Sequence, residues 1–231
     1  DYRFGSGLTL IDLLKRLDVV EGIDRIRISS IEPNLLTDEI IDFVSKSKSI
    51  LPHFHIPLQA GSDKILSLMK RRYGVELYKD RIAAVRSVMP DAGIGVDVIV
   101  GFPGESEVEF QETYDLIESL DISYLHVFTY SERPNTDAIN MSGKVGMRDR
   151  KTRNKRLTQL SERKNQSFAL RQLNQSKQVL LESSHDGVLT GMTENYLKVH
   201  IANPSETLLN SIVAVELTGL QNSKVLASIS I

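Results

Sequence analysis

Residues 93–105 read GIGVDVIVGFPGE, an apolar run from Gly93 to Val100 followed by a turn that contains two glycines and a proline. A short apolar run bounded by turn residues is typical of a strand buried in a sheet. Residues 106–120 (SEVEFQETYDLIESL) follow with the apolar spacing of an amphipathic helix and with acidic residues early. The two segments predict a buried strand followed by a helix that crosses back over the sheet.

The same alternation of helix and strand extends in both directions along the chain. Helices are predicted at 8–17, after the N-cap Thr37, from 63 and over 75–89, and strands at 25–30, 53–58 and 124–130. Strands separated by helices pair in parallel through crossover connections. We therefore expect an α/β unit that is a parallel β/α barrel or part of one.

The character of the sequence changes near Arg148. Residues 148–175 are polar and favour a helix, and five short β-rich runs follow at 178–182, 188–192, 196–201, 212–218 and 225–231. Five short strands separated by turn residues fit a small antiparallel β-barrel of the oligonucleotide-binding type. The predicted organisation is an α/β unit over 1–147, a basic linking helix over 148–175 and a small β-barrel over 176–231.

The composition excludes several classes of protein. Hydrophobic residues make up 41% of the 231 residues and charged residues 25%, with a net charge of −2, so neither a disordered nor a membrane-spanning chain is expected. With no export signal visible, we expect a cytoplasmic location. The chain has no cysteine, which excludes disulfides, cysteine nucleophiles and thiolate metal sites within it.

In a β/α barrel, chemistry is expected in the loops that follow the strands. These loops are Ser30–Asn34, Gln59–Ser62, Gly101–Glu105 and Ser131–Pro134. Their glycines let a ligand approach the backbone, and their hydroxyl, amide and carboxylate groups can fix ribose hydroxyls or an ammonium group. Taken one at a time, each loop is better explained as an ordinary turn.

Four segments, in chain order, resemble those of a known family: 55–62 (HIPLQAGS), 68–73 (LMKRRY), 97–105 (DVIVGFPGE) and 126–131 (HVFTYS). Together they resemble the radical S-adenosylmethionine (SAM) methylthiotransferases, and residues 191–199 (GMTENYLKV) look like the C-terminal TRAM domain of that family. Residues 27–33 (RISSIEP) and 126–134 look most like the MtaB-type branch. That branch methylthiolates threonylcarbamoyladenosine beside the tRNA anticodon.

The resemblance implies a partial TIM-like radical SAM barrel followed by a TRAM domain, with SAM as cofactor. The residues expected to lie near SAM are Ser30, Glu32, Gln59, Ser62, Ile99, Gly101, Phe128 and Tyr130. Ile99 and Gly101 match the family's Gly-x-Ile-x-Gly-x-x-Glu segment. Asp97 stands where that motif has glycine, and Glu105 comes one residue late, which puts a carboxylate role for Glu105 in doubt.

The family holds a four-iron four-sulfur (4Fe-4S) cluster through Cys-x-x-x-Cys-x-x-Cys, and no such motif is present here. The resemblance therefore implies that this chain is the C-terminal part of such an enzyme, without the cluster-binding region, and that it contains no catalytic residue and is inactive alone. In the intact enzyme, SAM is cleaved at the cluster to start a radical reaction. The sulfur and electron donors are not predicted.

A basic run predicts contact with nucleic acid, because the near-neutral chain can attract phosphate only through a local patch. Its six cations in nine residues are Arg148, Arg150, Lys151, Arg153, Lys155 and Arg156. A solvated helix face explains such a run as well. The adjoining β-barrel favours RNA, with Tyr196, Lys198 and His200 as candidates on one strand face. The expected partner is the tRNA anticodon stem-loop, with no membrane contact.

No metal site is predicted, because the histidines lack metal-binding spacing and His53 and His55 have no carboxylate or cysteine beside them in the sequence. Two other functions stay open. One is a non-catalytic RNA-binding protein on a SAM-type barrel scaffold. The other is the branch of the same family that modifies a ribosomal protein.

Overall fold

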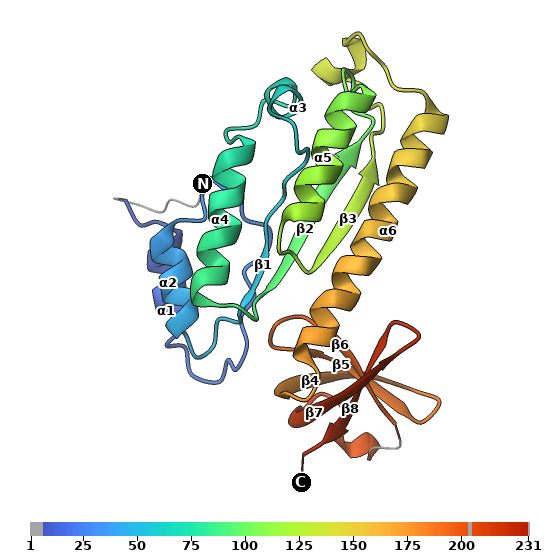
Figure 1. Ribbon diagram of the computed structural model, residues 1–231. Helices are drawn as coiled ribbons and strands as arrows, with labels where there is room; N and C mark the ends of the chain where they lie inside the picture. Colours follow the sequence, from blue (N-terminus) through green and yellow to red (C-terminus); the bar gives the residue numbers. More distant parts are fainter. Residues whose placement is uncertain (1–6, 203–204, 231) are drawn as a thin grey trace.

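The computed structural model describes residues 7–202 and 205–230 as two units joined by a long helix (Figure 1). The first unit is a parallel sheet covered by helices, and the second is a closed β-barrel. The predicted fold class, a parallel α/β unit followed by a small β-barrel, is confirmed.

The sheet contains three parallel strands in the order β1-β2-β3: β1 (His53–His55), β2 (Gly93–Val100) and β3 (Tyr124–Thr129). His55 is in register with Gly95, and Asp97 is in register with His126. The predicted strand at 25–30 is reduced to isolated bridges, Ile26 to Ile50 and Ser30 to His55. Both bridges are to residues 50–55, and within the described residues no regular ladder forms along 25–30.

β1 is also shorter than the predicted strand 53–58. Pro57 has no N–H to donate to a ladder, and Gln59, just beyond it, adopts a left-handed conformation with φ of 69°. The chain nevertheless continues beside β2, because the N–H groups of Ile56 and Leu58 donate to the carbonyls of Gly95 and Asp97. The path of the predicted strand is therefore kept although its regular part is short.

Within the described residues, the helices that precede α6 are α1 (Leu10–Leu17), α2 (Asp38–Lys46), α3 (Asp63–Leu68), α4 (Val75–Val88) and α5 (Glu107–Ser119). Thr37 accepts a hydrogen bond from Ile40 N and so caps α2 as predicted. Ser106 and Glu109 form a capping box at the start of α5. α3 ends at Leu68, and Lys70 then turns the chain with φ of 56°.

Alternate residues of the strands face opposite sides of the sheet. Phe54 and Ile56 on the β1 segment, and Ile94, Val96 and Val98 on β2, belong to the hydrophobic core with residues of α4 and α5. The other face of the sheet carries His53, His55, Asp97, Ile99, Tyr124, His126 and Phe128. We call it the open face, and it bears the polar and aromatic side chains that concern function.

Helix α6 (Met147–Gln172) spans 26 residues and connects the two units (Figure 1). Leu157 and Leu160 belong to the core of the sheet unit, whereas Phe168 and Ala169 belong to the core of the barrel. A helix of this length extends about 39 Å. The barrel lies near its C-terminal end, and the carboxyl ends of β2 and β3 lie toward its N-terminal end (Figure 1).

The barrel closes in the order β4-β5-β6-β8-β7. Its strands are β4 (Ser176–His185), β5 (Val188–Thr193), β6 (Lys198–Ala202), β7 (Ile212–Gln221) and β8 (Lys224–Ile229). All neighbours are antiparallel except β6 and β8. The part of the chain that the structure describes also forms the short 3-10 helices η1 (Asp137–Asn140) and η2 (Glu206–Leu208). Among the helices of the described residues, none has the length and apolar character needed to cross a bilayer.

A set of polar contacts fixes the barrel against the sheet unit. Arg25 donates to the carbonyl of Met192 (3.1 Å), and Arg27 donates to that of Thr193 (2.9 Å). The buried Asn195 amide donates to the carbonyl of Asp91 (2.8 Å) and to Gln172 Oε1 (3.0 Å). Because these bonds involve buried or half-buried groups, they favour one orientation of the two units.

Candidate functional site

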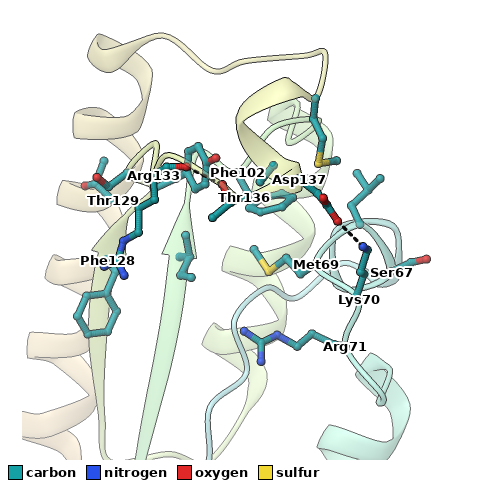
Figure 2. Close-up of a pocket in the computed structure, with 16 residues that line it drawn as sticks. Ser67, Met69, Lys70, Arg71, Phe102, Phe128, Thr129, Arg133, Thr136 and Asp137 are labelled. Carbon is teal, nitrogen blue, oxygen red and sulfur yellow. Dashed lines mark hydrogen bonds and ion pairs between the residues drawn. The ribbon is translucent and has the colours of Figure 1, made fainter.

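A cavity of about 940 Å³ opens at the carboxyl ends of β2 and β3. Its wall consists mainly of apolar and aromatic side chains from those strands, the following loops, the end of α3 and η1 (Figure 2). Phe102 and Tyr130 meet edge to face with ring centroids 5.3 Å apart. Such a wall suits a flat, partly apolar ligand, and its volume is that of a small-molecule site.

Two ion pairs bridge the segments around this cavity. Lys70 Nζ lies 2.6 Å from Asp137 Oδ2 and connects the end of α3 to η1 (Figure 2). Arg71 lies 3.3 Å from Glu32 and connects the cavity wall to the loop after the 25–30 segment. Loops that lie far apart in the sequence therefore gather at one end of the sheet.

Two polar atoms of lining residues have no hydrogen-bond partner among the described residues. They are the Tyr130 hydroxyl and Arg71 Nε, both buried. A buried polar atom without a partner costs stability, about 1–3 kcal/mol. Both atoms are covered by the surrounding protein, so the character of a binding site comes from the volume of the cavity and from its apolar, aromatic lining.

The loop below the cavity depends on Glu105. Its Oε2 accepts from Gly101 N (2.6 Å) and from Arg153 Nη1 (2.7 Å), and both Glu105 and Arg153 are buried. Burial raises the pKa of Glu105, although its hydrogen bonds act in the opposite direction. Gly101 has φ of 79°, a conformation that glycine adopts without strain. The Glu105 carboxylate therefore has a structural role: it stabilises the turn at the end of the 97–105 motif.

Arg150 is buried as well. It donates to the carbonyls of Val145 (2.8 Å) and Tyr130 (2.9 Å) and pairs with Glu132 at 2.6 Å. This pairing lowers the pKa of Glu132 to about 2. The prediction that Arg150 and Arg153 bind RNA phosphates is therefore corrected, because both guanidinium groups are buried and already paired within the protein.

The other cations of the run divide into two sets. Arg156 is half-buried and donates to Glu107 Oε1 (3.0 Å) and Gln111 Oε1 (2.9 Å). Arg148, Lys151 and Lys155 are exposed, and within the described ranges none of them has an ion pair. Their spacing places all three on one side of α6, opposite the buried Arg150 and Leu157. We call these three residues the cationic stripe.

The three barrel residues predicted to bind RNA, Tyr196, Lys198 and His200, do not lie on one strand face. Tyr196 lies outside any strand with φ of 68°, and its ring packs against His53 with centroids 4.4 Å apart. The prediction that Tyr196 shares a strand face with Lys198 and His200 is wrong, because β6 begins only at Lys198. Lys198 is exposed on β6 and remains available to a partner.

The structure gathers part of the predicted SAM site. Ile99, Phe128 and Tyr130 line the cavity. Ser30 and Glu32 line a separate groove beside α1. Gln59 and Gly101 lie in the turns that follow the β1 segment and β2, and Ser62 is buried at the start of α3, so these three residues are not part of the cavity wall.

Several lining residues were not predicted as site residues. They include Met69, Lys70, Arg71, Phe102, Arg133, Asp137 and Met141. Two of the segments that carry them are identified from the sequence, 68–73 as a family motif and 131–134 as a loop after a strand. Nothing in the sequence showed that η1 would fold over the same cavity.

The open face also holds a carboxylate beside His55, where the sequence had shown none. His55 Nε2 lies 2.8 Å from Asp97 Oδ1. The two residues are 42 positions apart in the chain, and only the pairing of β1 with β2 brings them together. The reason given for excluding a metal site is therefore wrong for His55.

Comparison with known proteins places the chain in context. The profile of the Radical SAM superfamily matches residues 5–117. The threonylcarbamoyladenosine tRNA methylthiotransferases MtaB of Bacillus subtilis and Aquifex aeolicus are each 38% identical to the chain, over 94% and 86% of its length. A tRNA-2-methylthio-N(6)-dimethylallyladenosine synthase of Chromohalobacter salexigens is 35% identical over 96%. The chain spans about half the length of these relatives, namely 48%, 47% and 50%.

Proposed function

Since the chain belongs to the radical SAM superfamily, we propose that it is part of a tRNA methylthiotransferase whose cavity at the carboxyl ends of β2 and β3 holds the adenosyl part of SAM. The observation that carries the proposal is a cavity with an apolar and aromatic wall at that end of a parallel sheet. In β/α barrels this end is where ligands bind.

The residues present fit such a ligand. Phe102, Phe128 and Tyr130 offer ring faces and edges to an adenine. The Arg71 guanidinium, at the wall of the cavity, can attract a carboxylate by its charge. When bound, SAM would supply the methyl and adenosyl groups of the reaction. The side chains named here would position it and exclude water from its apolar surface.

An iron-sulfur cluster does not fit these 231 residues. Such clusters are held by thiolates, and the chain has no cysteine. The 4Fe-4S cluster of the family therefore has no ligand set here, and we expect the 231-residue chain to show no methylthiolation by itself. Electron and sulfur donors are not identified by any residue of this chain.

The proposed RNA substrate is the anticodon stem-loop of a tRNA, and a cytoplasmic location suits it. The cationic stripe lies at the end of α6 that is near the cavity and can contact phosphates there. The barrel over 176–231 has only three lysines against five carboxylates, so most of the attraction for phosphate must come from α6. Lys198 can add one contact from the barrel.

The proposed base is threonylcarbamoyladenosine, because the two relatives at 38% identity carry that substrate in their names. The test is mass spectrometry of tRNA nucleosides from cells that lack the gene. Loss of the methylthio form of threonylcarbamoyladenosine supports the proposal. Loss of the methylthio form of dimethylallyladenosine instead, or no loss, would show that the proposed base is wrong.

The cavity itself is tested with SAM by calorimetry and ligand-observed NMR on the 231-residue chain. Phe128→Ala should weaken binding about tenfold, since one base–aromatic stack is removed. Val108→Ala is the matched control, because Val108 is 65% exposed on α5 and away from the cavity. If both variants bound SAM equally, or if the wild type did not bind it, the proposal that SAM binds in this cavity would be wrong.

A further inference from the structure

Three side chains with metal-binding atoms meet on the open face of the sheet. They are His55, Asp97 and His126, one from each neighbouring strand segment of β1, β2 and β3. Their ligand atoms all lie within 4.8 Å of one another. His55 Nε2 is 2.8 Å from Asp97 Oδ1, and the rings of His55 and His126 have centroids 5.5 Å apart.

The register of the sheet produces this arrangement. Asp97 pairs with His126 across β2 and β3, and His55 pairs with Gly95, the next residue of β2 on the same face. The side chains of His55 and Asp97 are 21% and 18% exposed, so the strands hold them firmly. His126 is exposed and can rotate. Two ligands are therefore fixed in advance, and the third can adjust.

We propose that His55, Asp97 and His126 form a binding site for a divalent transition metal of the Zn²⁺ type. Two imidazole nitrogens and one carboxylate are the donor set that Zn²⁺ and Fe²⁺ accept while leaving positions open. Mg²⁺ and Ca²⁺ prefer oxygen donors alone and suit this set poorly. The site contains no sulfur ligand.

The observed distances allow the metal to enter with small side-chain movements. Ligand atoms around a tetrahedral Zn²⁺ lie about 3.3 Å apart, given metal–ligand distances near 2.0–2.1 Å. The His55–Asp97 separation of 2.8 Å must increase slightly. The separations that involve His126 must decrease from at most 4.8 Å, which a rotation of this exposed ring achieves.

The metal site lies next to the cavity, where a bound metal could contact a ligand. Ile99 and Phe128 follow Asp97 and His126 by two residues on the same face, and both line the cavity. A metal held by Asp97 and His126 would therefore lie next to the cavity. A carboxylate or hydroxyl of a ligand could occupy its open coordination positions. The metal site does not depend on the identity of the cavity's ligand, so it can hold or fail independently of the proposed function.

The test uses the 231-residue chain with Zn²⁺ and Co²⁺. Equilibrium dialysis with elemental analysis should give one metal per chain, and Co²⁺ should show the visible d–d bands of a low-coordinate nitrogen and oxygen site. Loss of an outer hydrogen-bond partner already costs roughly 10- to 100-fold in metal affinity. His126→Gln and Asp97→Asn remove direct ligands and should weaken binding by about 100-fold or more.

His185→Gln is the matched control. His185 also lies beside a carboxylate, with Nδ1 2.9 Å from Asp186 Oδ2, but both side chains are highly exposed on the barrel. Its loss should leave metal binding unchanged. Should Asp97→Asn fail to fold by circular dichroism, His126→Gln, which alters an exposed side chain, carries the test. Absence of binding by the wild type, binding unaltered in His126→Gln, or binding lost in His185→Gln would each overturn the proposal.

Discussion

The guanidinium carbon of Arg27 lies 4.6 Å from the centroid of the Tyr196 ring. Arg27 comes from the sheet unit and Tyr196 from the barrel, so this contact crosses the junction between them. The same ring packs against His53 at 4.4 Å, and Tyr124 lies 6.1 Å away. Tyr196 therefore reaches the amino ends of the strands, at the opposite end of the sheet from the cavity, and holds the barrel there.

Replacement of Tyr196 by alanine should weaken this junction. The loss of one aromatic packing contact and one cation–π contact predicts a decrease of about 1–2 kcal/mol in the free energy of unfolding. Tyr196→Phe keeps the ring and should change that free energy by less than about 0.5 kcal/mol. Urea denaturation measures both variants. If phenylalanine destabilised as much as alanine, the ring contacts would not be the cause.

Breaking the buried pair of Glu105 and Arg153 should destabilise the protein more than the loss of Tyr196. Glu105→Gln leaves the Arg153 guanidinium buried without its main counter-charge, which should cost about 3 kcal/mol in the free energy of unfolding. Glu107 contacts the same arginine at 3.4 Å, but its side chain is 66% exposed. Glu107→Gln should therefore cost less than about 1 kcal/mol. Similar losses in the two variants, measured by urea denaturation, would contradict this distinction between buried and exposed partners.

Local patterns predicted most of the elements because apolar periodicity and capping residues act over short distances. Strand β2 has the predicted bounds Gly93–Val100, and Thr37 caps α2 as expected. The segment at 25–30 alternates like a strand but has a regular partner on neither side, and the sequence does not show which segments lie at an edge. Strand pairing, which depends on the whole chain, decided that difference.

The site was less predictable because its residues meet only through tertiary structure. Residues 148–156 carry six cations that look equivalent in the sequence, yet Arg150 and Arg153 are buried against Glu132 and Glu105. The spacing of Arg148, Lys151 and Lys155 places them on one side of a helix. The sequence alone does not show that this side is the exposed one. His55 and Asp97 became neighbours through register alone, which no short sequence pattern encodes.

Acid should destabilise the protein partly through Glu109. Its hydrogen bonds with Lys64 (2.6 Å) and Ser106 N (2.8 Å) lower the pKa of its carboxyl from 4.5 to about 2. Since the pKa is lower in the folded state, this group stabilises the fold above pH 4.5, and that contribution is lost as the pH falls toward 2. Glu109→Gln should therefore reduce the dependence of unfolding free energy on pH in this window. Glu112→Gln, on an exposed position of the same helix, should leave the pH dependence unchanged when denaturation is measured at pH 3 and pH 7.

The cationic stripe should determine much of the affinity for tRNA. Replacing Arg148, Lys151 and Lys155 by glutamine removes three candidate phosphate contacts without disturbing a buried pair. The slope of the logarithm of affinity against the logarithm of salt concentration should then decrease in magnitude by about 2 to 3.

The control replaces Lys15, Lys46 and Lys79 by glutamine, which removes the same amount of positive charge from other helices. These lysines lie on α1, α2 and α4 and pair with Glu39, Asp42 and Glu76. Nitrocellulose filter binding at several salt concentrations measures the affinity of each triple variant for an anticodon stem-loop. If both triple variants lost affinity and slope equally, only net charge would matter, and α6 would not be the phosphate-binding surface. A change confined to the stripe variant would assign the contact to the helix that joins the cavity end of the sheet to the barrel.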